Sequence, residues 1–227
     1  MKQIKVFVPN LKERPDRKTH ISSEFKKFNI FDLKIINAIK HTHGSIGLWL
    51  TFKQIIENIK DENFEFILFC EDDHKFLSNF EPEQLERDIA IGKELNADLL
   101  LGGVSWFDVA VKATERIFWL NKFSGCQFMV IYKKFFPNIM SISGFNGNEA
   151  LDHKLSNLTS NTFVIHPFIS VQKEFGYSDV TFFNGKAGRV TQLFEQSIKR
   201  LDILNKVSDF FNSNKQKLDV CQKTQKK

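Results

Sequence analysis

The sequence is poor in tyrosine and tryptophan, and it contains no long uncharged apolar run. Its aromatic residues are 25 Phe against only 2 Tyr and 3 Trp. Because phenyl rings supply apolar area without a phenol or indole group to satisfy, we expect this surplus to fill the core. No stretch reaches the roughly 18 uncharged apolar residues that span a bilayer, and the start of the chain lacks the apolar region and cleavage site of a signal peptide. These absences predict a globular, cytoplasmic protein.

Cysteine is scarce as well. The three cysteines, Cys70, Cys126 and Cys221, lie far apart and form no CxxC pair. An odd number at this spacing indicates neither a disulfide framework nor a zinc site, which agrees with a reducing compartment. The contents of hydrophobic residues (42%) and charged residues (26%) are ordinary for soluble domains and exclude disordered, collagen-like and polytopic membrane proteins.

The net charge of +5 is unevenly distributed along the 227 residues. The stretch 61–86 is acidic, whereas residues 215–227 hold five lysines and one aspartate. A basic tail can bind anionic lipid or nucleic acid, but a solvated terminus has the same composition. We expect no nucleic-acid partner and keep a peripheral contact with the inner face of a membrane as a hypothesis.

Strand and helix patterns alternate along the chain. Alternating or continuous apolar runs predict strands over residues 3–8, 31–36, 64–70, 98–101, 125–132 and 162–165. Apolar residues at helical spacing predict helices over residues 16–28, 46–59, 81–95, 133–142, 148–158 and 190–212. This order predicts an α/β fold: a mostly parallel, nucleotide-binding sheet flanked by helices, with ligands at the carboxyl ends of its strands. Residues 104–121 show no clear period, and residues 173–188 are predicted to be irregular.

The length predicts one large domain with an appendage. We place the domain at residues 1–188 and an amphipathic helix with a basic tail at residues 189–227. An apolar stripe runs down this helix, and we expect it to pack on the body of the protein. Its members are Leu193, Phe194, Ile198, Leu201, Leu204, Val207, Phe210 and Phe211.

Three consecutive acids, Glu71, Asp72 and Asp73, follow the apolar run of residues 64–70 directly. At the carboxyl end of a strand they are placed where a ligand binds. Adjacent carboxylates repel one another, and their hard oxygens suit Mg²⁺ or Mn²⁺, whose remaining positions substrate phosphates can fill. A solvated acidic turn before a helix gives the same pattern, and the buried strand before it is what favours the metal.

Basic side chains follow the first predicted strand. Residues 10–17 read NLKERPDR, and arginines in such a loop can hold phosphates together with helix-terminal amides. Taken alone, the pattern is equally typical of solvated surface arginines.

Taken in order, these segments resemble glycosyltransferase family 25, which contains lipopolysaccharide and capsule galactosyltransferases and the collagen galactosyltransferases. Residues 8–17 are similar to that family's opening INLxxRxDR, and residues 69–73 (FCEDD) to its LEDD signature. The other similar segments follow in the family's order over residues 3–180: Ala38, residues 44–51, 97–102, 126–133, 151–155, and Gln172 with Ser178 and Asp179.

The sequence departs from the family pattern at three places. Ser45 stands where the family has an acidic residue, and Thr51 and Phe52 stand where it has Ser-His. The segment after Tyr132 lacks the family's Gly-Ala pair. Any role of the missing Glu and His is therefore lost or relocated.

The resemblance implies a GT-A type fold and a metal-dependent, inverting transfer from a UDP-sugar, with galactose as the family's most frequent donor sugar. It implies a glycan or lipid-linked oligosaccharide acceptor in lipopolysaccharide or capsular polysaccharide biosynthesis. Mn²⁺ (or Mg²⁺) would be held by Asp73 with Glu71, and a histidine, His153 or His166, could add a third ligand. The implied nucleotide contacts are Asn10, Leu11, Arg14, Arg17, Ala38 and Asp72.

Inversion requires one general base, distinct from the metal motif, to take the proton of the acceptor hydroxyl. Asp152 is the first candidate, and Glu149, about one helical turn earlier, is the second. Two other interpretations stay open. The chain could be a catalytically degenerate module that binds a nucleotide or glycan, or a glycoside hydrolase that uses paired acids roughly 5–10 Å apart. Adjacent acids at one strand end make the hydrolase the weakest of the three.

Overall fold

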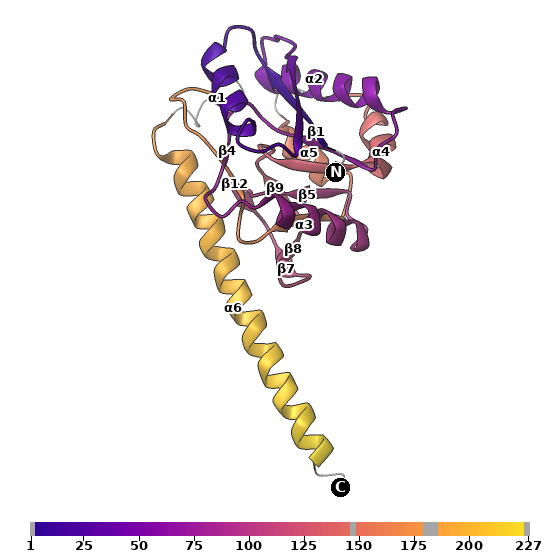
Figure 1. The fold of residues 1–227 in the computed structure, drawn as a ribbon, viewed down its shortest axis with the longest axis vertical. Helices are drawn as coiled ribbons and strands as arrows, with labels where there is room; N and C mark the ends of the chain where they lie inside the picture. The colour runs from indigo at the N-terminus through magenta and orange to yellow at the C-terminus, as the bar shows by residue number, and fades with distance from the viewer. Residues whose placement is uncertain (1–2, 146–148, 179–185, 225–227) are drawn as a thin grey trace.

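A computed structural model describes residues 3–145, 149–178 and 186–224 of the chain (Figure 1). Its centre is an eight-stranded sheet, in which two strands run opposite to the others. In spatial order the strands are β2 (Phe31–Asn37), β1 (Ile4–Asn10), β3 (Phe66–Phe69), β10 (Met129–Tyr132), β5 (Leu99–Leu101), β11 (Thr162–Ile165), β8 (Ile117–Leu120) and β7 (Ala110–Lys112). The reversed strands are β10 and β8. The predicted α/β class with a mostly parallel sheet is confirmed.

Helices cover both faces of this sheet. On one face lie α2 (Gly44–Ile59), α4 (Phe136–Met140), α5 (Leu151–Ser156) and the first part of α6 (Arg189–Thr224). On the other lie α1 (Pro15–Phe25) and α3 (Pro82–Glu94). Alternate residues of each central strand enter opposite cores: Ile67 and Phe69 face the first, and Leu68 faces the second. Burial on both faces explains the nearly continuous apolar runs, and most of the phenylalanines are buried, as expected.

Several short elements escaped the sequence patterns. They are β4 (His74–Phe76) paired with β12 (Ser170–Gln172), and β6 (Trp106–Phe107) paired with β9 (Phe123–Ser124). The helix predicted over residues 133–142 begins instead as the 3₁₀ turn η1 (Lys133–Phe135) and continues as α4. Together β6, β7 and β8 occupy half of the segment 104–121 that carried no prediction. Strands of two to four residues are too short to display a period of two.

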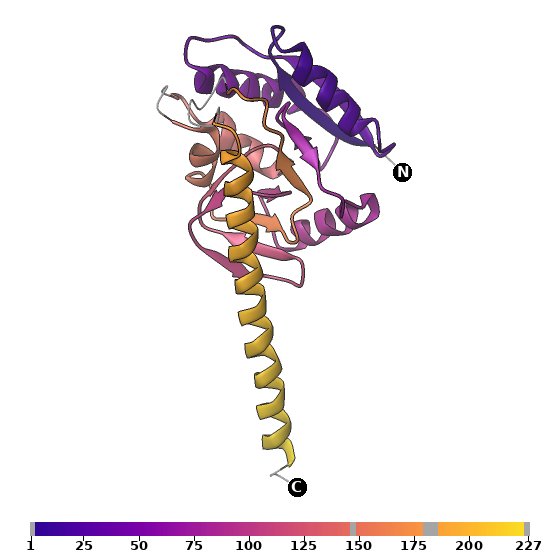
Figure 2. The ribbon, with the colours of Figure 1, turned by 90° about the vertical axis from the view of Figure 1, so that its left-hand side faces the viewer.

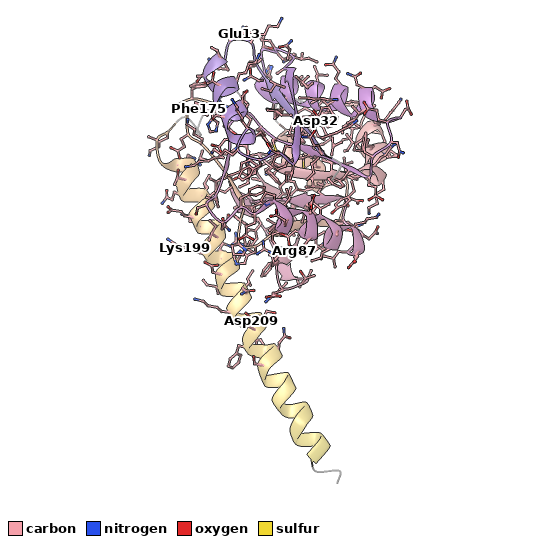
Figure 3. The ribbon with its side chains drawn as sticks, in the orientation of Figure 1. Glu13, Asp32, Arg87, Phe175, Lys199 and Asp209 are labelled. Carbon is pink, nitrogen blue, oxygen red and sulfur yellow. The ribbon has the colours of Figure 1, made fainter. Side chains whose placement is uncertain are left out.

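The last helix is longer than predicted and packs over only part of its length. Phe194 and Leu201 are buried, but Phe210 and Phe211 are 63% and 66% exposed. Figures 1 and 2 show α6 continuing well past the body, and Asp209, labelled in Figure 3, lies where the helix leaves it. The expectation that the whole stripe packs is therefore wrong beyond the middle of the helix, because the sheet ends before the helix does. Residues 225–227 of the tail lie outside the described residues.

None of the described helices combines the length and the apolar character that crossing a bilayer requires.

The loop after β2 is held directly against α2. A Cβ placed on Gly47 would lie 2.4 Å from the carbonyl oxygen of Ile39, so only glycine allows this approach. The backbone N–H of Ile39 donates to Thr51 Oγ1 at 2.8 Å. Thr51 thus anchors the loop where the family pattern has serine, and neighbouring Phe52 fills the core against Phe69.

Candidate functional site

A cleft of about 700 Å³ opens at the carboxyl ends of β1, β3 and β5. Segments that are distant in sequence line it, namely the loops after β1, β2 and β3, residues 105–106, 124–126 and 150–153, the loop 172–178 and the start of α6. This is the edge at which ligands bind in open α/β sheets.

The acidic wall of the cleft consists of Glu71, Asp72 and Asp73, which follow β3. Asp72 accepts hydrogen bonds from Asn10 Nδ2 and Arg17 Nη1, both at 2.8 Å. The same Arg17 nitrogen donates to Asp73 Oδ2 at 3.2 Å. Asp73 Oδ1 is buried and has no hydrogen-bond partner among the described residues. One carboxylate oxygen of the wall is therefore left without a proton donor or cation.

The acids of this wall outnumber the positive charge that pairs with them. Burial raises the pKa of Glu71 well above its usual range, and the charges of Asp73, Asp152 and Asp72 raise it further. Burial likewise raises the pKa of Asp73 to about 7, although Arg17 opposes the shift. A bound cation would relieve both carboxylates.

Arg17 also fastens the loop 173–178 to α1. Its Nη2 donates to the carbonyl oxygen of Tyr177 at 3.1 Å, and its guanidinium lies 4.8 Å from the Tyr177 ring and 5.0 Å from that of Phe175. The Tyr177 hydroxyl donates to Asp16 at 2.9 Å, and Arg14 lies 4.2 Å from the same ring. Figure 3 shows Phe175 beside α1. Both terminal nitrogens of Arg17 are thus occupied by hydrogen bonds within the protein.

Asp152, in the first turn of α5, reaches the cleft from the other direction. Its Oδ2 accepts from the backbone N–H of Gly125 at 2.8 Å, and its Oδ1 accepts from that of His153 at 2.8 Å. Gly125 has a φ of 112°, in the left-handed region that favours glycine. Since Asp152 raises the pKa of Glu71, its charge acts directly on the acidic wall. The carboxylate is therefore fixed in direction, in the same cleft as the three other acids.

The predicted site residues separate into two groups. Those that line the cleft are Leu11, Arg17, Ala38, Glu71, Asp72, Asp73 and Asp152. Asn10 lies behind Asp72 with 4% of its surface exposed, and Arg14 stacks on Tyr177. Glu149 is outside the cleft lining and pairs with Lys154 Nζ at 3.1 Å. Asp179 lies outside the described residues.

The structure does not bring His166 to the acidic wall. Its Nε2 lies 3.1 Å from Asp202 Oδ1 on α6, and its ring meets Phe118 edge-on. His166 follows β11, which β10 and β5 separate from β3 in the sheet. His166 is therefore not placed to bind a metal at the acidic wall. It holds α6 to the body instead.

Sequence patterns missed several residues of the cleft. Lys40 and Lys173 bring positive charge to its lining, and Trp106 brings an exposed aromatic ring. Gln172 donates to Glu71 Oε2 at 2.9 Å, and its place in the family's terminal motif was the one available signal. Trp106 lies in the stretch without a period, so no signal marked it.

A divalent cation fits the donor chemistry of the acidic wall. Within the described parts of the chain, no group of three or more His, Cys, Asp or Glu side chains is placed to hold a metal. Mg²⁺ and its analogues are commonly bound by one or two carboxylates, with substrate phosphates and water completing the shell. The partnerless oxygen of Asp73 and the buried carboxyl of Glu71 have the chemistry of two such ligands.

Comparisons with known proteins bear on the fold. No protein-family model matches the chain, and no curated protein matches its sequence. Among solved structures, A197 from STIV is similar with a TM-score of 0.50 and 13% identity, covering 75% of this chain and 85% of that one. UDP-glucose pyrophosphorylase is similar in its apo form (TM-score 0.46, 10% identity, 88% of this chain and 82% of that one). A UDP-glucose pyrophosphorylase in complex with UDP-glucose is similar as well, with a TM-score of 0.47 and 9% identity, covering 88% of this chain and 100% of that one. At such identities the likeness to A197 extends to the fold and not to an activity.

Proposed function

We propose that this chain is a metal-dependent, inverting glycosyltransferase of the family-25 type. It moves a sugar, galactose in the first instance, from a UDP-sugar onto a glycan acceptor in lipopolysaccharide or capsular polysaccharide biosynthesis. The observation that carries the proposal is the meeting of the acidic wall with Asp152 in one cleft at the carboxyl ends of the strands. The order of the family motifs along the sequence supports it independently.

In this proposal Asp73 and Glu71 hold Mn²⁺ or Mg²⁺. The chemistry that such a cation would supply is an offset to the negative charge on the leaving diphosphate. Asp72 has a different task, because Asn10 and Arg17 occupy its two oxygens. It keeps the turn after β3 in place so that the neighbouring carboxylates face the cleft.

Asp152 acts as the general base. The acceptor hydroxyl attacks the anomeric carbon as the bond to the diphosphate oxygen breaks, and its proton passes to a carboxylate oxygen of Asp152. The two backbone N–H groups that bind Asp152 fix the direction of its carboxylate. Glu149 is a poorer candidate, because Lys154 holds it outside the cleft lining.

The nucleotide is proposed to lie along the loops after β1 and β2, where Leu11 and Ala38 line the cleft. Lys40, which pairs with Glu13 at 2.6 Å, and Lys173 also line the cleft and would bring positive charge to the diphosphate. Arg17 and Arg14 then act chiefly through Tyr177 and the loop that it anchors.

Binding of the donor tests the proposal most directly. We expect UDP to bind the wild-type protein in isothermal titration calorimetry with MnCl₂, and much more weakly with excess chelator. Asp73→Asn removes a proposed ligand without changing its size and should lose the Mn²⁺-dependent binding. Asp61→Asn, at an exposed position beyond α2, is the matched control and should bind as the wild type does. Equal UDP affinity with and without chelator contradicts the metal, and no UDP binding at all contradicts the function.

Turnover separates the transferase from a degenerate binding module. Thermal-shift screening of UDP-Gal, UDP-Glc, UDP-GlcNAc and UDP-GalNAc with Mn²⁺ identifies the donor, and release of UDP from that donor then measures activity. A donor that binds but is neither hydrolysed nor transferred to any glycan acceptor supports the binding module.

We further propose that the far part of α6 contacts an anionic membrane surface that carries a lipid-linked acceptor. Ile203, Val207, Phe210 and Phe211 form an exposed apolar stripe there, and five lysines follow within residues 215–227. An apolar helix face flanked by lysines suits a lipid interface. In sedimentation with phosphatidylglycerol vesicles, the wild type should pellet and a Phe210→Ser/Phe211→Ser variant should not. Sedimentation of neither protein, or dimers of the wild type in light scattering that the variant loses, contradicts the membrane contact.

A further inference from the structure

We propose that a second wall of the cleft, formed by Trp106, Ser124 and His153, binds a pyranose ring of the acceptor. We call it the Trp106 wall. The inference deepens the proposed function, and it rests on that function only where it identifies the bound sugar as the acceptor. The binding of a neutral sugar ring stands on the geometry of the wall itself.

Trp106 lines the cleft and is exposed there, although large apolar side chains are normally covered in a folded protein. Its exposed fraction is 41%, whereas Trp49, a member of the core on the α2 face of the sheet, is 4% exposed. Trp119 uses its indole N–H to bind the carbonyl oxygen of Ser160, but the Trp106 indole has no such partner among the described residues. An open aromatic face beside a few polar groups is typical of a small-molecule site.

The polar groups of the wall lie next to this ring. Trp106 pairs with Ser124 across the β6–β9 ladder, which places the two residues directly opposite each other. Ser124 Oγ and His153 Nε2 are 3.0 Å apart. The backbone N–H of His153 in turn binds Asp152, the proposed base. An aromatic face, a hydroxyl and an imidazole therefore lie in sequence beside the carboxylate that would accept the proton.

The chemistry of the wall selects a sugar over a phosphate. Residues 105–106, 124–126 and 150–153 bring no lysine or arginine to the cleft, among the described residues, and they do bring the carboxylate of Asp152. A diphosphate would be repelled there. A pyranose suits the wall, because the C–H bonds of one face carry partial positive charge and meet the negative face of an aromatic ring. Its hydroxyl groups, at the edge of the ring, can bind Ser124 and His153.

A nucleobase could also stack on an indole, and the test has to distinguish the two. The variants are Trp106→Ala, which removes the ring, and Trp106→Phe, which keeps an aromatic face. Val111→Ala is the matched control, since Val111 is 55% exposed on neighbouring β7 and does not line the cleft. The probes are methyl β-galactoside, methyl β-glucoside and lactose, titrated by saturation-transfer NMR with UDP and MnCl₂ present. UDP affinity is measured separately by calorimetry.

We expect at least one saccharide to bind the wild type, about tenfold more weakly to Trp106→Ala, and within a few-fold of wild type to Trp106→Phe and Val111→Ala. UDP affinity should stay the same in all four proteins. Saccharide binding that survives in Trp106→Ala, or that is undetectable in the wild type, overturns the inference. So does a loss of UDP affinity in Trp106→Ala, which would assign the ring to the nucleobase and leave the proposed function standing. If UDP binds to none of them while Trp106→Ala still loses the saccharide, the transferase fails and the sugar-binding wall stands.

Discussion

The two walls of the cleft differ in how far their side chains are buried and paired within the protein. On the acidic wall, the side chains of Asp72 and Asp73 are 13% and 15% exposed; Arg17 binds both, and Asn10 binds Asp72. On the Trp106 wall, a large ring stands open with no such partners. Partly buried carboxylates are costly unless they are paired, so the acidic wall commits folding energy to a fixed arrangement of charge. An exposed indole costs little folding free energy. The Trp106 wall can therefore suit a ligand without contributing much to stability.

This difference predicts where a substitution acts. Changes on the acidic wall should alter stability, pH dependence and metal binding together. Changes on the Trp106 wall should alter affinity for a saccharide and leave stability alone. Asp152 touches both, because it raises the pKa of Glu71 and binds the backbone of His153.

The largest expected effect is on turnover in Asp152→Asn. Loss of a general base lowers kcat by about 10²–10⁴-fold, whereas UDP binding should be unchanged because Asp152 contacts no proposed nucleotide position. Initial rates of UDP release with donor and acceptor measure the first quantity, and calorimetry measures the second. Glu149→Gln is the control and should stay within a few-fold of wild type, since Glu149 is outside the cleft lining. Unchanged turnover in Asp152→Asn rejects Asp152 as the base.

The next effect is on stability. Arg17→Met leaves Asp72 and Asp73 without their cation, and removing one partner of a buried pair costs about 3–5 kcal/mol. Urea unfolding at pH 7.5 measures the loss. The deficit should shrink at pH 5, where Asp73 can take up a proton. Arg87→Met, on the exposed side of α3, should stay within about 0.5 kcal/mol of wild type. A deficit that is the same at both pH values would show that packing on Tyr177, and not charge, is what Arg17 contributes.

Much of the acidic wall could be foreseen from sequence, because its acids follow an apolar run that indicates a strand buried on both faces. What could not be foreseen is contact across long separations. Arg17 meets Asp72 across 55 positions, and nothing in the loop after β1 indicates that partner. His166 also follows a strand, but chain order does not reveal that β10 and β5 stand between β11 and β3.

The Trp106 wall was invisible to sequence patterns for a different reason. β6 and β9 are two-residue strands, so neither shows an alternation. Whether a tryptophan is covered or open depends on what packs over it, and that is settled by tertiary structure. The far end of α6 makes the same point: its apolar stripe continues in sequence after the body it should cover has ended.

The third prediction concerns pH. The folded-state pKa of Asp73 is raised from 3.8 to about 7, and that of Glu71 is raised too. Each group contributes stability that is fully present below its unfolded pKa and is lost as the pH rises through the folded pKa. In chelator, Tm should therefore fall by several degrees between about pH 4.5 and pH 7.5, since 1 kcal/mol shifts Tm by roughly 2–4 °C in a chain of this size.

Two variants decide the origin of that fall. Asp73→Asn has no titrating group at the position, so its Tm should depend less steeply on pH than that of the wild type. Asp61→Asn should follow the wild type. Equal slopes in Asp73→Asn and wild type would mean that the acidic wall is not what makes the fold sensitive to pH.

The smallest expected effect lies at the rim, beside the loop after β2. In Gly47→Ala the added Cβ would lie 2.4 Å from the carbonyl oxygen of Ile39, so the backbone must move. We expect the free energy of unfolding to fall by about 1–3 kcal/mol. Gly144→Ala is the matched control, because nothing lies within 4 Å of its added Cβ, and it should be neutral to within about 0.5 kcal/mol. Urea unfolding measures both. The displaced loop carries Lys40, so Gly47→Ala should also weaken UDP binding while saccharide binding at Trp106 persists. Equal losses of both ligands would show that the two walls move as one unit and that the contrast between them is not functional.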